Sequence, residues 1–315
     1  AFDPLKLYLP KTIISSYIHI TVMSEKVKAA VVPAKGAKLG IQLVDKPTPK
    51  PFIYDESSGE RGELLVKIKA IALNPVDIYQ VENGLFVEEY PVILGNDVAG
   101  IVEAVGEGVT EFSPGDEICG FTRLGVPGHY GAFSEYTLLE ASTTYKKPPN
   151  FTFREAATIP VCTLTAGLGL FESLKLPVPS ENHSWFREEY ILYLNELGAA
   201  YTIDYNAPDV VDQIKNASEG RLKYAFDAVG SKDTVSLGIQ ALSSNVKRDG
   251  IEVTQVTLGR AHKEPKGYLK CTNRVLKEVE TMLHDGRIRP VNVTSIPGGL
   301  DGILPALEKL KVGEF

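Results

Sequence analysis

The stretch from Pro177 to Asn206 limits what the second half of this chain can fold into. Its right half, LNELGAAYTIDYN, predicts the end of a helix followed by a buried strand over Ala200–Asp204. Its left half, PVPSENHS, is typical of a loop. A phosphate-binding βαβ unit needs a strand, a glycine-rich turn and a helix between two such pieces. Here the loop leads almost directly into the late helix, so the phosphate-binding turn has to be sought elsewhere.

The residues around this stretch alternate between helix and strand patterns. A helical run over 152–174 begins with a capping threonine, and further helices are expected over 209–217 and 233–242. Between those two helices, LKYAFDAVG (222–230) predicts a strand. Such alternation is typical of a parallel, doubly wound α/β sheet.

The first half of the chain has a different, β-rich pattern. NPVDIYQVENG (74–84) predicts its one short helix, with Asn74 as N-cap, Pro75 at the first helical position and Gly84 as the stop. The other apolar runs are short and bounded by glycine, proline or acidic residues, which is typical of strands. These runs lie at 27–32, 63–73, 100–106, 116–121 and 131–139.

Composition narrows the class of protein. The chain has 315 residues, 43% hydrophobic and 23% charged, which fits a soluble globular protein of two domains. Its 33 basic and 40 acidic residues give a net charge of −7 without any basic block, so we expect no nucleic-acid partner. Cys119, Cys162 and Cys271 are odd in number and far apart, which favours a reducing, cytoplasmic location.

The first 22 residues stand apart from this pattern. They are apolar with scattered charges, and they fit a signal peptide poorly. No run of about 18 uninterrupted apolar residues predicts a membrane span. We interpret residues 1–22 as a leader outside any domain, with Met23 as the natural start.

Several motifs together carry a family resemblance that extends from Met23 onward. They are NPVD (74–77), YPVILGNDVAGIVEAVGEGVTEFSPGDEICGF (90–121), YGAFSEY (130–136), EAATIPVCTLTAGLGLF (155–171), FDAVG (226–230) and PGGLDGILPALEKLKVG (297–313). The chain resembles the medium-chain dehydrogenase/reductase superfamily, in the zinc-independent branch of quinone oxidoreductases and fungal trans-enoyl reductases.

The resemblance implies two domains and a reaction. It implies a GroES-like β-barrel catalytic domain over 23–160, a Rossmann-type NADPH-binding domain over 161–286, and a return to the GroES-like domain over 287–315. Hydride transfer from NADPH to a small-molecule enone, quinone or enoyl thioester is the implied chemistry, in a monomer or homodimer.

The resemblance also tests for zinc. A catalytic zinc needs three protein ligands. Where zinc-dependent relatives carry a cysteine and a Gly-His-Glu run, this chain carries Asn74 and the run Gly95, Asn96, Asp97. We therefore predict no metal. The histidines lack ligand spacing and are read as surface or loop residues: His19, His129, His183, His262 and His284.

Without a metal, hydrogen bonds must polarise the substrate carbonyl. The resemblance places Asn74, Asp77 and Tyr79 at the nicotinamide end of the cleft as the candidate catalytic residues. Asn74 and Asp77 could equally serve only to cap the short helix. Where related enoyl reductases place a proton-donating tyrosine, this chain offers Phe86 and then Tyr90, so the proton donor stays unassigned.

Four residues are candidates for cofactor binding. Thr165 matches a threonine that meets the nicotinamide carboxamide or a phosphate, although it could be a hydroxyl at a helix N-terminus. Tyr205 matches a tyrosine that packs on the adenine ribose 2′-phosphate, although it could be a surface residue at a strand end. Val229 and Gly230 end a predicted strand, where open α/β sheets bind ligands, and Gly230 could serve only the turn.

The resemblance also accounts for the stretch from Pro177 to Asn206. Relatives carry roughly forty further residues within 177–206, about the length of a βαβ start. The glycine pairs at 106–108, 167–169 and 298–300 lie in the barrel, in a helix and in a late turn, so none replaces the missing loop.

Two further segments depart from the family pattern. QALSSNVKRDGIEV (240–253) lacks an expected strand, and the sequence stops at KVGEF before a final barrel strand. We therefore expect weak or absent NADPH binding. The losses indicate either a faulty gene model, a mis-spliced product or fragment, or a genuine pseudoenzyme that binds or regulates through its GroES-like barrel.

Overall fold

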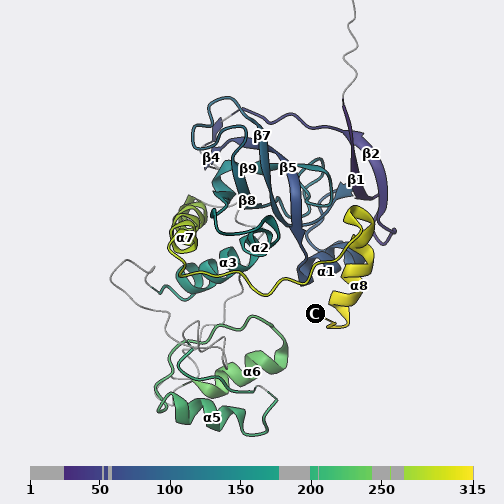
Figure 1. The fold of residues 1–315 in the computed structure, drawn as a ribbon. Coiled ribbons are helices and arrows are strands. Elements are labelled where there is room, and N and C mark those ends of the chain that lie inside the picture. Colours follow the sequence, from purple (N-terminus) through teal and green to yellow (C-terminus); the bar gives the residue numbers. More distant parts are fainter. Residues whose placement is uncertain are drawn as a thin grey trace, which may run out of the picture.

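A computed structural model describes residues 25–51, 53–55, 59–176, 199–204, 206–242, 256 and 266–314 (Figure 1). The leader over 1–22 and Tyr205 lie outside these residues. The described chain contains helices and antiparallel sheets, so the predicted α/β class with a β-rich first part is confirmed.

Three antiparallel sheets form the first half of the chain. The largest has the order β10-β8-β7-β5-β9, a second has the order β2-β1-β6, and β3 pairs with β4. The strands are β1 (Lys26–Val32), β2 (Gly40–Asp45), β3 (Ile53–Asp55), β4 (Gly59–Arg61), β5 (Glu63–Ala72), β6 (Val92–Ile93), β7 (Asp97–Val105), β8 (Glu117–Phe121), β9 (Tyr136–Glu140) and β10 (Thr144–Lys146).

Four of the five predicted strand runs are confirmed, and the fifth needs a correction. Of the run 131–139 only the second part forms a strand, β9. The preceding residues bond instead to the loop before β7: Ala132 N donates to Gly95 O at 3.0 Å, and Phe133 N donates to Leu94 O at 2.8 Å. Backbone groups satisfied by this loop are not free to extend the ladder.

The alternating pattern of β5 explains its position between β7 and β9. Leu64 and Val66 are completely buried and join a cluster with Val98 of the neighbouring β7 and Ile118 of β8. The intervening Leu65 belongs to a different cluster with Tyr136 and Leu138. Both faces of the first half of β5 are therefore covered.

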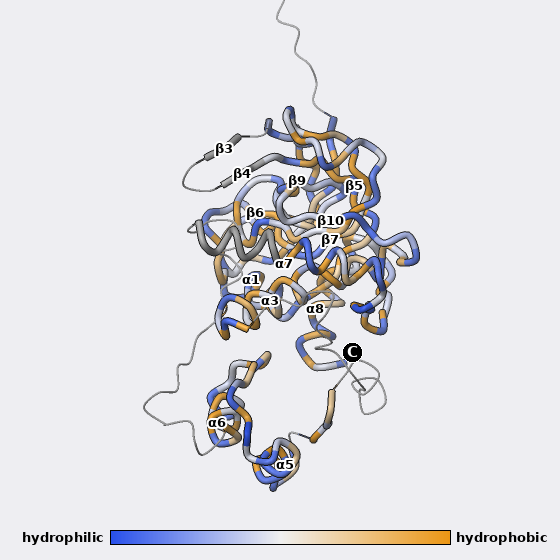
Figure 2. The backbone as a smooth tube through the Cα atoms, turned by 90° about the vertical axis from the view of Figure 1, so that its left-hand side faces the viewer, coloured by the Kyte–Doolittle hydropathy of each residue, from blue (hydrophilic) through white to orange (hydrophobic). Residues whose placement is uncertain are grey.

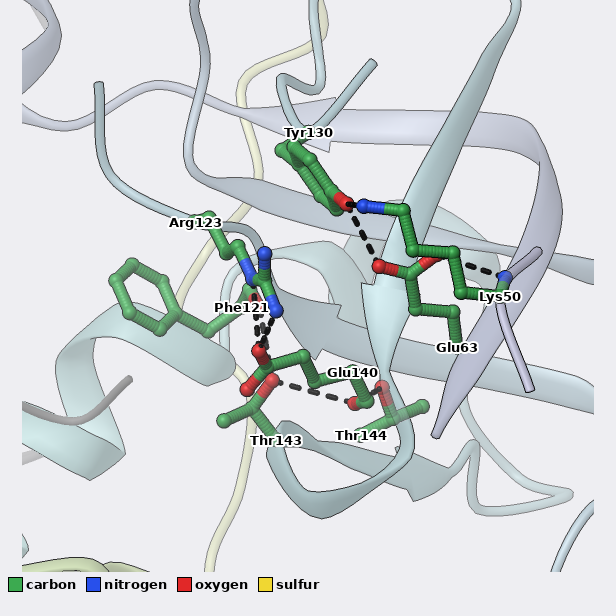
Figure 3. Close-up of polar contacts among 8 residues, drawn as sticks. All are labelled: Lys50, Glu63, Phe121, Arg123, Tyr130, Glu140, Thr143 and Thr144. Atoms are coloured by element: carbon green, nitrogen blue, oxygen red, sulfur yellow. Dashed lines mark hydrogen bonds and ion pairs between the residues drawn. The ribbon is translucent and has the colours of Figure 1, made fainter. Parts of the chain in front are cut away.

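A buried polar network joins β5, β9 and the loop that follows β8 (Figure 3). Glu63 and Glu140 are register partners on β5 and β9. Tyr130 Oη donates to Glu63 Oε1 at 2.6 Å, and Lys50 Nζ donates to Tyr130 Oη at 3.0 Å. Arg123 Nε donates to Glu140 Oε1 at 2.7 Å, while its guanidinium lies 4.5 Å from the centroid of the Tyr130 ring. Each buried carboxylate thus has a partner, as its desolvation requires.

Helices cover one side of these sheets. Thr152, the predicted capping threonine, caps α2 (Phe153–Ala157) in a capping box with Glu155. Pro160 then starts a second helix, because a proline without an N–H suits the first helical position. The helices are α1 (Pro75–Asn83), α2 (Phe153–Ala157), α3 (Pro160–Gly167), the π-helix η2 (Leu168–Ser173), α7 (Lys266–His284) and α8 (Ile303–Lys311), with 3₁₀ turns at η1 (Ala141–Thr143) and η5 (Gly299–Gly302).

The C-terminal part of the chain packs back on the first part. A Cβ atom at Gly167 would lie 2.2 Å from Val275 Cγ1, so the glycine allows α7 to approach α3 closely. Val275 joins Phe121 of β8 in one core cluster. Ile303 of α8 belongs to the cluster that contains Val31 of β1. The helices of the second half therefore share cores with the strands.

The segment 199–242 is organised differently. It contains α5 (Val210–Ala217) and α6 (Lys232–Ala241), which confirm two predicted helices. Figures 1 and 2 show both helices apart from the labelled strands. Phe226 contacts the π-helix, since a Cβ atom at Gly169 would lie 2.2 Å from its ring.

The predicted strands over 200–204 and 222–230 are wrong. Neither range contains a strand, and within the described part of the chain no strand lies beside either one. A strand exists only where a neighbour completes its hydrogen-bond ladder. Side chains expected to be buried are consequently open to solvent, with Tyr201 66% and Val229 76% exposed.

One helical run among the described residues, Phe153–Ser173, is long and apolar enough to cross a membrane by length and composition alone. Half of its most apolar 18-residue window is buried inside the protein, where Leu164 and Leu168 belong to the core cluster around Phe121. Its apolar character is accounted for by this packing.

Candidate functional site

Five buried polar side chains meet where β5 leads into α1 and β7 begins. Each is at most 7% exposed. We name them the amide–carboxyl cluster: Asn74, Asp77, Gln80, Asn96 and Asp97.

Local sequence and strand pairing bring this cluster together. Ala72 of β5 pairs with Asp97 of β7, which places the start of α1 beside the start of β7. Asp77 and Gln80 are three residues apart and therefore lie on one face of α1. The capping role predicted for Asn74, with Pro75 following and Gly84 as the left-handed stop, is confirmed.

Hydrogen bonds connect the cluster around Asp77. Its Oδ2 accepts from Asn74 N at 2.6 Å, and its Oδ1 accepts from Asn96 Nδ2 at 2.6 Å. Asn96 Nδ2 also donates to Gln80 Oε1 at 2.8 Å. Gln80 Nε2 is buried and has no hydrogen-bond partner within the described residues.

Asp97 extends the cluster to helix α3. Its Oδ2 accepts from Asn74 Nδ2 at 2.9 Å, and its Oδ1 accepts from Val161 N at 2.8 Å. Asn74 thus contacts both acids, with its backbone N–H on Asp77 and its side-chain amide on Asp97.

Burial changes the acidity of both carboxyl groups. Desolvation raises the pKa of Asp77 to about 7, against the opposing effect of hydrogen bonds from Asn74 and Asn96. Desolvation also raises the pKa of Asp97 well above its usual range, and the nearby charge of Asp77 adds to that increase. Ionisation of Asp77 and Asp97 is therefore disfavoured by their burial, and the cluster is able to hold a proton near neutral pH.

The three candidate catalytic residues are placed unequally. Asn74 and Asp77 lie together in the cluster, and Asp77 is completely buried, with both its carboxyl oxygens hydrogen-bonded. Tyr79 lies on the other side of α1 and is 53% exposed. Tyr90, one of the two residues at the proton-donor position, sets its hydroxyl against Gly84, 2.5 Å from where a Cβ atom would be.

The candidate cofactor residues are not gathered in one place. Thr165 lies in the second turn of α3, so the alternative reading as a helix N-terminal hydroxyl is wrong. Val229 and Gly230 lie just before Ser231, the N-cap of α6, and Figures 1 and 2 show α6 apart from α1. Tyr205 falls outside the described residues.

Asp227 organises the turn that contains Val229 and Gly230. Its Oδ1 accepts from Val229 N at 2.9 Å and from Gly230 N at 3.0 Å, and its Oδ2 accepts from Thr234 Oγ1 at 2.7 Å. Two adjacent backbone N–H groups are the kind of donors that hold a phosphate. Here a carboxylate of the same chain already occupies them.

Three members of the cluster were not predicted as site residues from the sequence: Gln80, Asn96 and Asp97. Gln80 follows Asn74 and Asp77 at intervals of three, and this spacing could have placed it on the same helical face. Asn96 and Asp97 entered the sequence prediction only as the positions where zinc-dependent relatives carry a Gly-His-Glu run. The hydrogen bond between Asp97 and Val161 joins residues 64 positions apart. No local sequence pattern predicts such a contact.

A surface hollow of about 550 Å³ lies elsewhere. It shares no residue with the amide–carboxyl cluster, and its lining is Asn150, Phe151, Glu155, Asp285, Gly286, Ile288, Arg289 and Pro290.

Comparison with known proteins gives consistent results. The alcohol dehydrogenase GroES-like domain matches residues 60–149. Trans-enoyl reductase resD of Aspergillus sclerotiorum is 30% identical over 336 residues, covering 84% of this chain and 91% of that protein.

Solved structures share the fold. A quinone oxidoreductase of Pseudomonas syringae pv. tomato superposes with a TM-score of 0.64 at 22% identity, covering 91% of this chain and 96% of that one. A mycobacterial protein complexed with NADPH gives a TM-score of 0.58 at 21% identity, again covering 91% and 96%.

Proposed function

The chain belongs to the medium-chain dehydrogenase/reductase superfamily, a family of oxidoreductases, and we propose that it descends from a zinc-independent, NADPH-dependent reductase whose cofactor binding is impaired in this chain. Its substrate class by descent is a small molecule with an activated C=C bond or a quinone: an enone, a quinone or an enoyl thioester.

The hydrogen bonding of the amide–carboxyl cluster carries the zinc-independent part of this proposal. Asn74, Asn96 and Asp97 stand where zinc-dependent relatives have ligands, and here they bond to one another or to Asp77. Each carboxyl oxygen accepts from an N–H group, whose positive end repels a cation. Within the described residues, no group of three or more His, Cys, Asp or Glu side chains could hold a metal ion.

Within the proposed reaction, the residues on and beside this cluster have different roles. Asn74 is held by both acids, so its carboxamide has a fixed direction for a hydrogen bond to a substrate carbonyl. We assign Asp77 to orienting Asn74, since both its carboxyl oxygens accept hydrogen bonds, one of them from the Asn74 N–H. Desolvation, against these hydrogen bonds, raises the pKa of Asp77 to about 7. Tyr79 lies on α1 between Asp77 and Gln80, and its side chain is exposed. Its hydroxyl would contact the substrate at the protein surface.

The turn before α6 offers no free cradle for the pyrophosphate of the dinucleotide. A pyrophosphate needs free backbone N–H groups at a helix N-terminus. The N–H groups of Val229 and Gly230 instead bond to Asp227, whose negative charge would repel a phosphate. Thr165, Tyr205, Val229 and Gly230 remain our proposed contacts to the two ends of NADPH, without a cradle between them.

The same observation favours a second candidate function. A chain that has lost its pyrophosphate site but keeps well-packed sheets could act without catalysis, as a binding or regulatory protein. We further propose a cytoplasmic monomer or homodimer, with the units 23–160, 161–286 and 287–315 acting as the GroES-like domain, the truncated cofactor domain and the return segment.

A titration of NADPH, followed by nicotinamide fluorescence, tests the proposal. The matched control is the same chain with a strand, glycine turn and helix inserted within 177–206. Several charge-assisted backbone hydrogen bonds, each worth about 1.5–3 kcal/mol, predict at least about a thousandfold weaker binding for the present chain. Circular dichroism first establishes that both proteins fold.

Two outcomes separate the alternatives. If the restored chain binds NADPH and reduces an enone or quinone in the presence of a chelator, the reductase ancestry stands. Equal micromolar binding by both proteins would overturn the impairment, because another segment would then hold the phosphates.

A further inference from the structure

Among the side chains of the amide–carboxyl cluster, that of Asp97 alone has a described hydrogen bond outside the β5–α1–β7 junction. It is 1% exposed at the start of β7. One carboxyl oxygen accepts from the side chain of Asn74 at 2.9 Å, and the other accepts from the backbone of Val161 at 2.8 Å. A single carboxyl group therefore bridges two helices.

The bond to Val161 supplies something that α3 lacks locally. The first N–H groups of a helix have no partner within the helix. Ile159 occupies the N-cap position of α3 and offers no side-chain hydrogen bond, and Pro160 has no N–H. The N–H of Val161 is consequently capped from another part of the chain, by Asp97.

The bond to Asn74 fixes the other end of the bridge. Asn74 is the N-cap of α1 and 7% exposed, and its backbone N–H is already held by Asp77. With Nδ2 directed at Asp97, the carboxamide plane of Asn74 has one orientation relative to α3.

We propose that Asp97 is a positioning residue that holds the carboxamide of Asn74 and the first turn of α3, the helix that carries Thr165, in one fixed register. The functional meaning rests on the proposed function, because Asn74 and Thr165 are the candidate contacts on the substrate and cofactor sides. The register itself rests only on the two hydrogen bonds.

Asp97→Asn tests this bridge, since the bridge uses both carboxyl oxygens and the amide replaces one of them with an NH₂ group, which cannot accept. Asp77→Asn is the matched control: it changes a second buried acid of the same cluster, which also bonds to Asn74 but not to α3. Hydrogen exchange of residues 158–167 and the side-chain amide resonance of Asn74 are measured in the full chain without any cofactor.

We expect the amides of 158–167 to exchange at least about tenfold faster in Asp97→Asn, while Asp77→Asn leaves them within about threefold of the wild type. The Asn74 side-chain amide resonance should move in Asp97→Asn as well. If Asp77→Asn has the same effect on 158–167, or if the Asn74 resonance stays in place in Asp97→Asn, the bridge is disproved.

Should Asp97→Asn fail to fold, the wild-type chain still decides the matter. A scalar coupling across the hydrogen bond from Val161 N to the carboxyl carbon of Asp97 must then be present, and its absence overturns the proposal. Because neither measurement uses NADPH, loss of the proposed function and loss of the bridge are recorded independently.

Discussion

Strand β5 and the segment 222–230 are both rich in apolar residues, but only β5 forms a strand. ELLVKIKAIA becomes the ten-residue strand β5 between β7 and β9, with Leu64 and Val66 completely buried. LKYAFDAVG forms no strand, and its Val229 is 76% exposed. The difference lies in the neighbours, because a run of apolar residues becomes a strand only where other strands complete its hydrogen bonds and cover its faces.

The comparison predicts a large difference in local stability between the sheets and segment 199–242. Hydrogen exchange should show the amides of β5 and β7 protected at least about 10⁴-fold, since they open only with global unfolding. The amides of 222–228 should be protected less than about tenfold. Equal protection would mean that this segment joins a sheet in solution, and the contrast would then be lost.

A matched pair of phenylalanines gives the next largest effect. Phe121 of β8 is completely buried in the core, whereas Phe226 is 41% exposed beside the π-helix. Phe121→Ala should lower the free energy of unfolding by about 3–5 kcal/mol, and Phe226→Ala by less than about 1 kcal/mol. Urea unfolding measures both, with unchanged m-values as the control. Similar costs for the two would show that the second segment has a core of its own.

Buried and exposed carboxylates extend the comparison to polar groups. Glu140 is 2% exposed and paired with Arg123, while Asp227 lies in an exposed turn. Glu140→Gln should cost about 2–3 kcal/mol, because it leaves the guanidinium without its anion in the network of Figure 3. Asp227→Asn should cost less than about 1 kcal/mol. Thermal unfolding of the two variants side by side checks the ranking, which a larger loss for Asp227→Asn would reverse.

Counted per pH unit, the smallest predicted effect concerns pH. Burial raises the pKa of Asp77 from its ordinary value of 3.8 to about 7, so the folded chain binds this proton more tightly than the unfolded chain does. This contribution is complete below about pH 4 and is lost as pH rises to about 7, at no more than about 1.4 kcal/mol per pH unit. Asp77→Asn should flatten that slope in urea unfolding between pH 4 and 8.

Asp227 contributes with the opposite sign. Desolvation raises its pKa, but hydrogen bonds from Gly230, Thr234 and Val229 together outweigh that effect and lower it. Its stabilising contribution is therefore present above its unfolded pKa and is lost as pH falls through the folded one.

If Asp77→Asn leaves the pH dependence of stability unchanged, the carboxyl group of Asp77 is hydrated in solution. The electrostatic contrast between buried Asp77 and exposed Asp227 would then disappear.

Features set by neighbours in the sequence were predictable. The cap at Asn74, the start at Pro75 and the stop at Gly84 depend on a few adjacent residues, and all three are confirmed. The capping box of Thr152 and Glu155 is equally local. The absent strands were not predictable from apolar pattern alone, because that pattern does not reveal whether neighbouring strands are present.

In the candidate site too, contacts between residues close in sequence were predictable, and contacts made by tertiary packing were not. Asn74 and Asp77 share a helical turn, so their proximity follows from spacing. The bond from Val161 to Asp97 depends on how α3 packs against β7, and the use of the Val229 and Gly230 N–H groups by Asp227 depends on the turn that forms when 222–230 is not a strand. Both contacts arise from tertiary structure.

Helix α1 has a consequence for protein engineering. Its two fully buried side chains, Asp77 and Gln80, are polar, and its most exposed large side chain, Tyr79, is aromatic. A redesign guided by hydropathy would replace Gln80 with leucine and Tyr79 with a charged residue. The first change removes the acceptor of an Asn96 hydrogen bond, and the second removes the exposed hydroxyl. In this helix, substitutions that improve the amphipathic score are the ones to leave out of a stabilised variant.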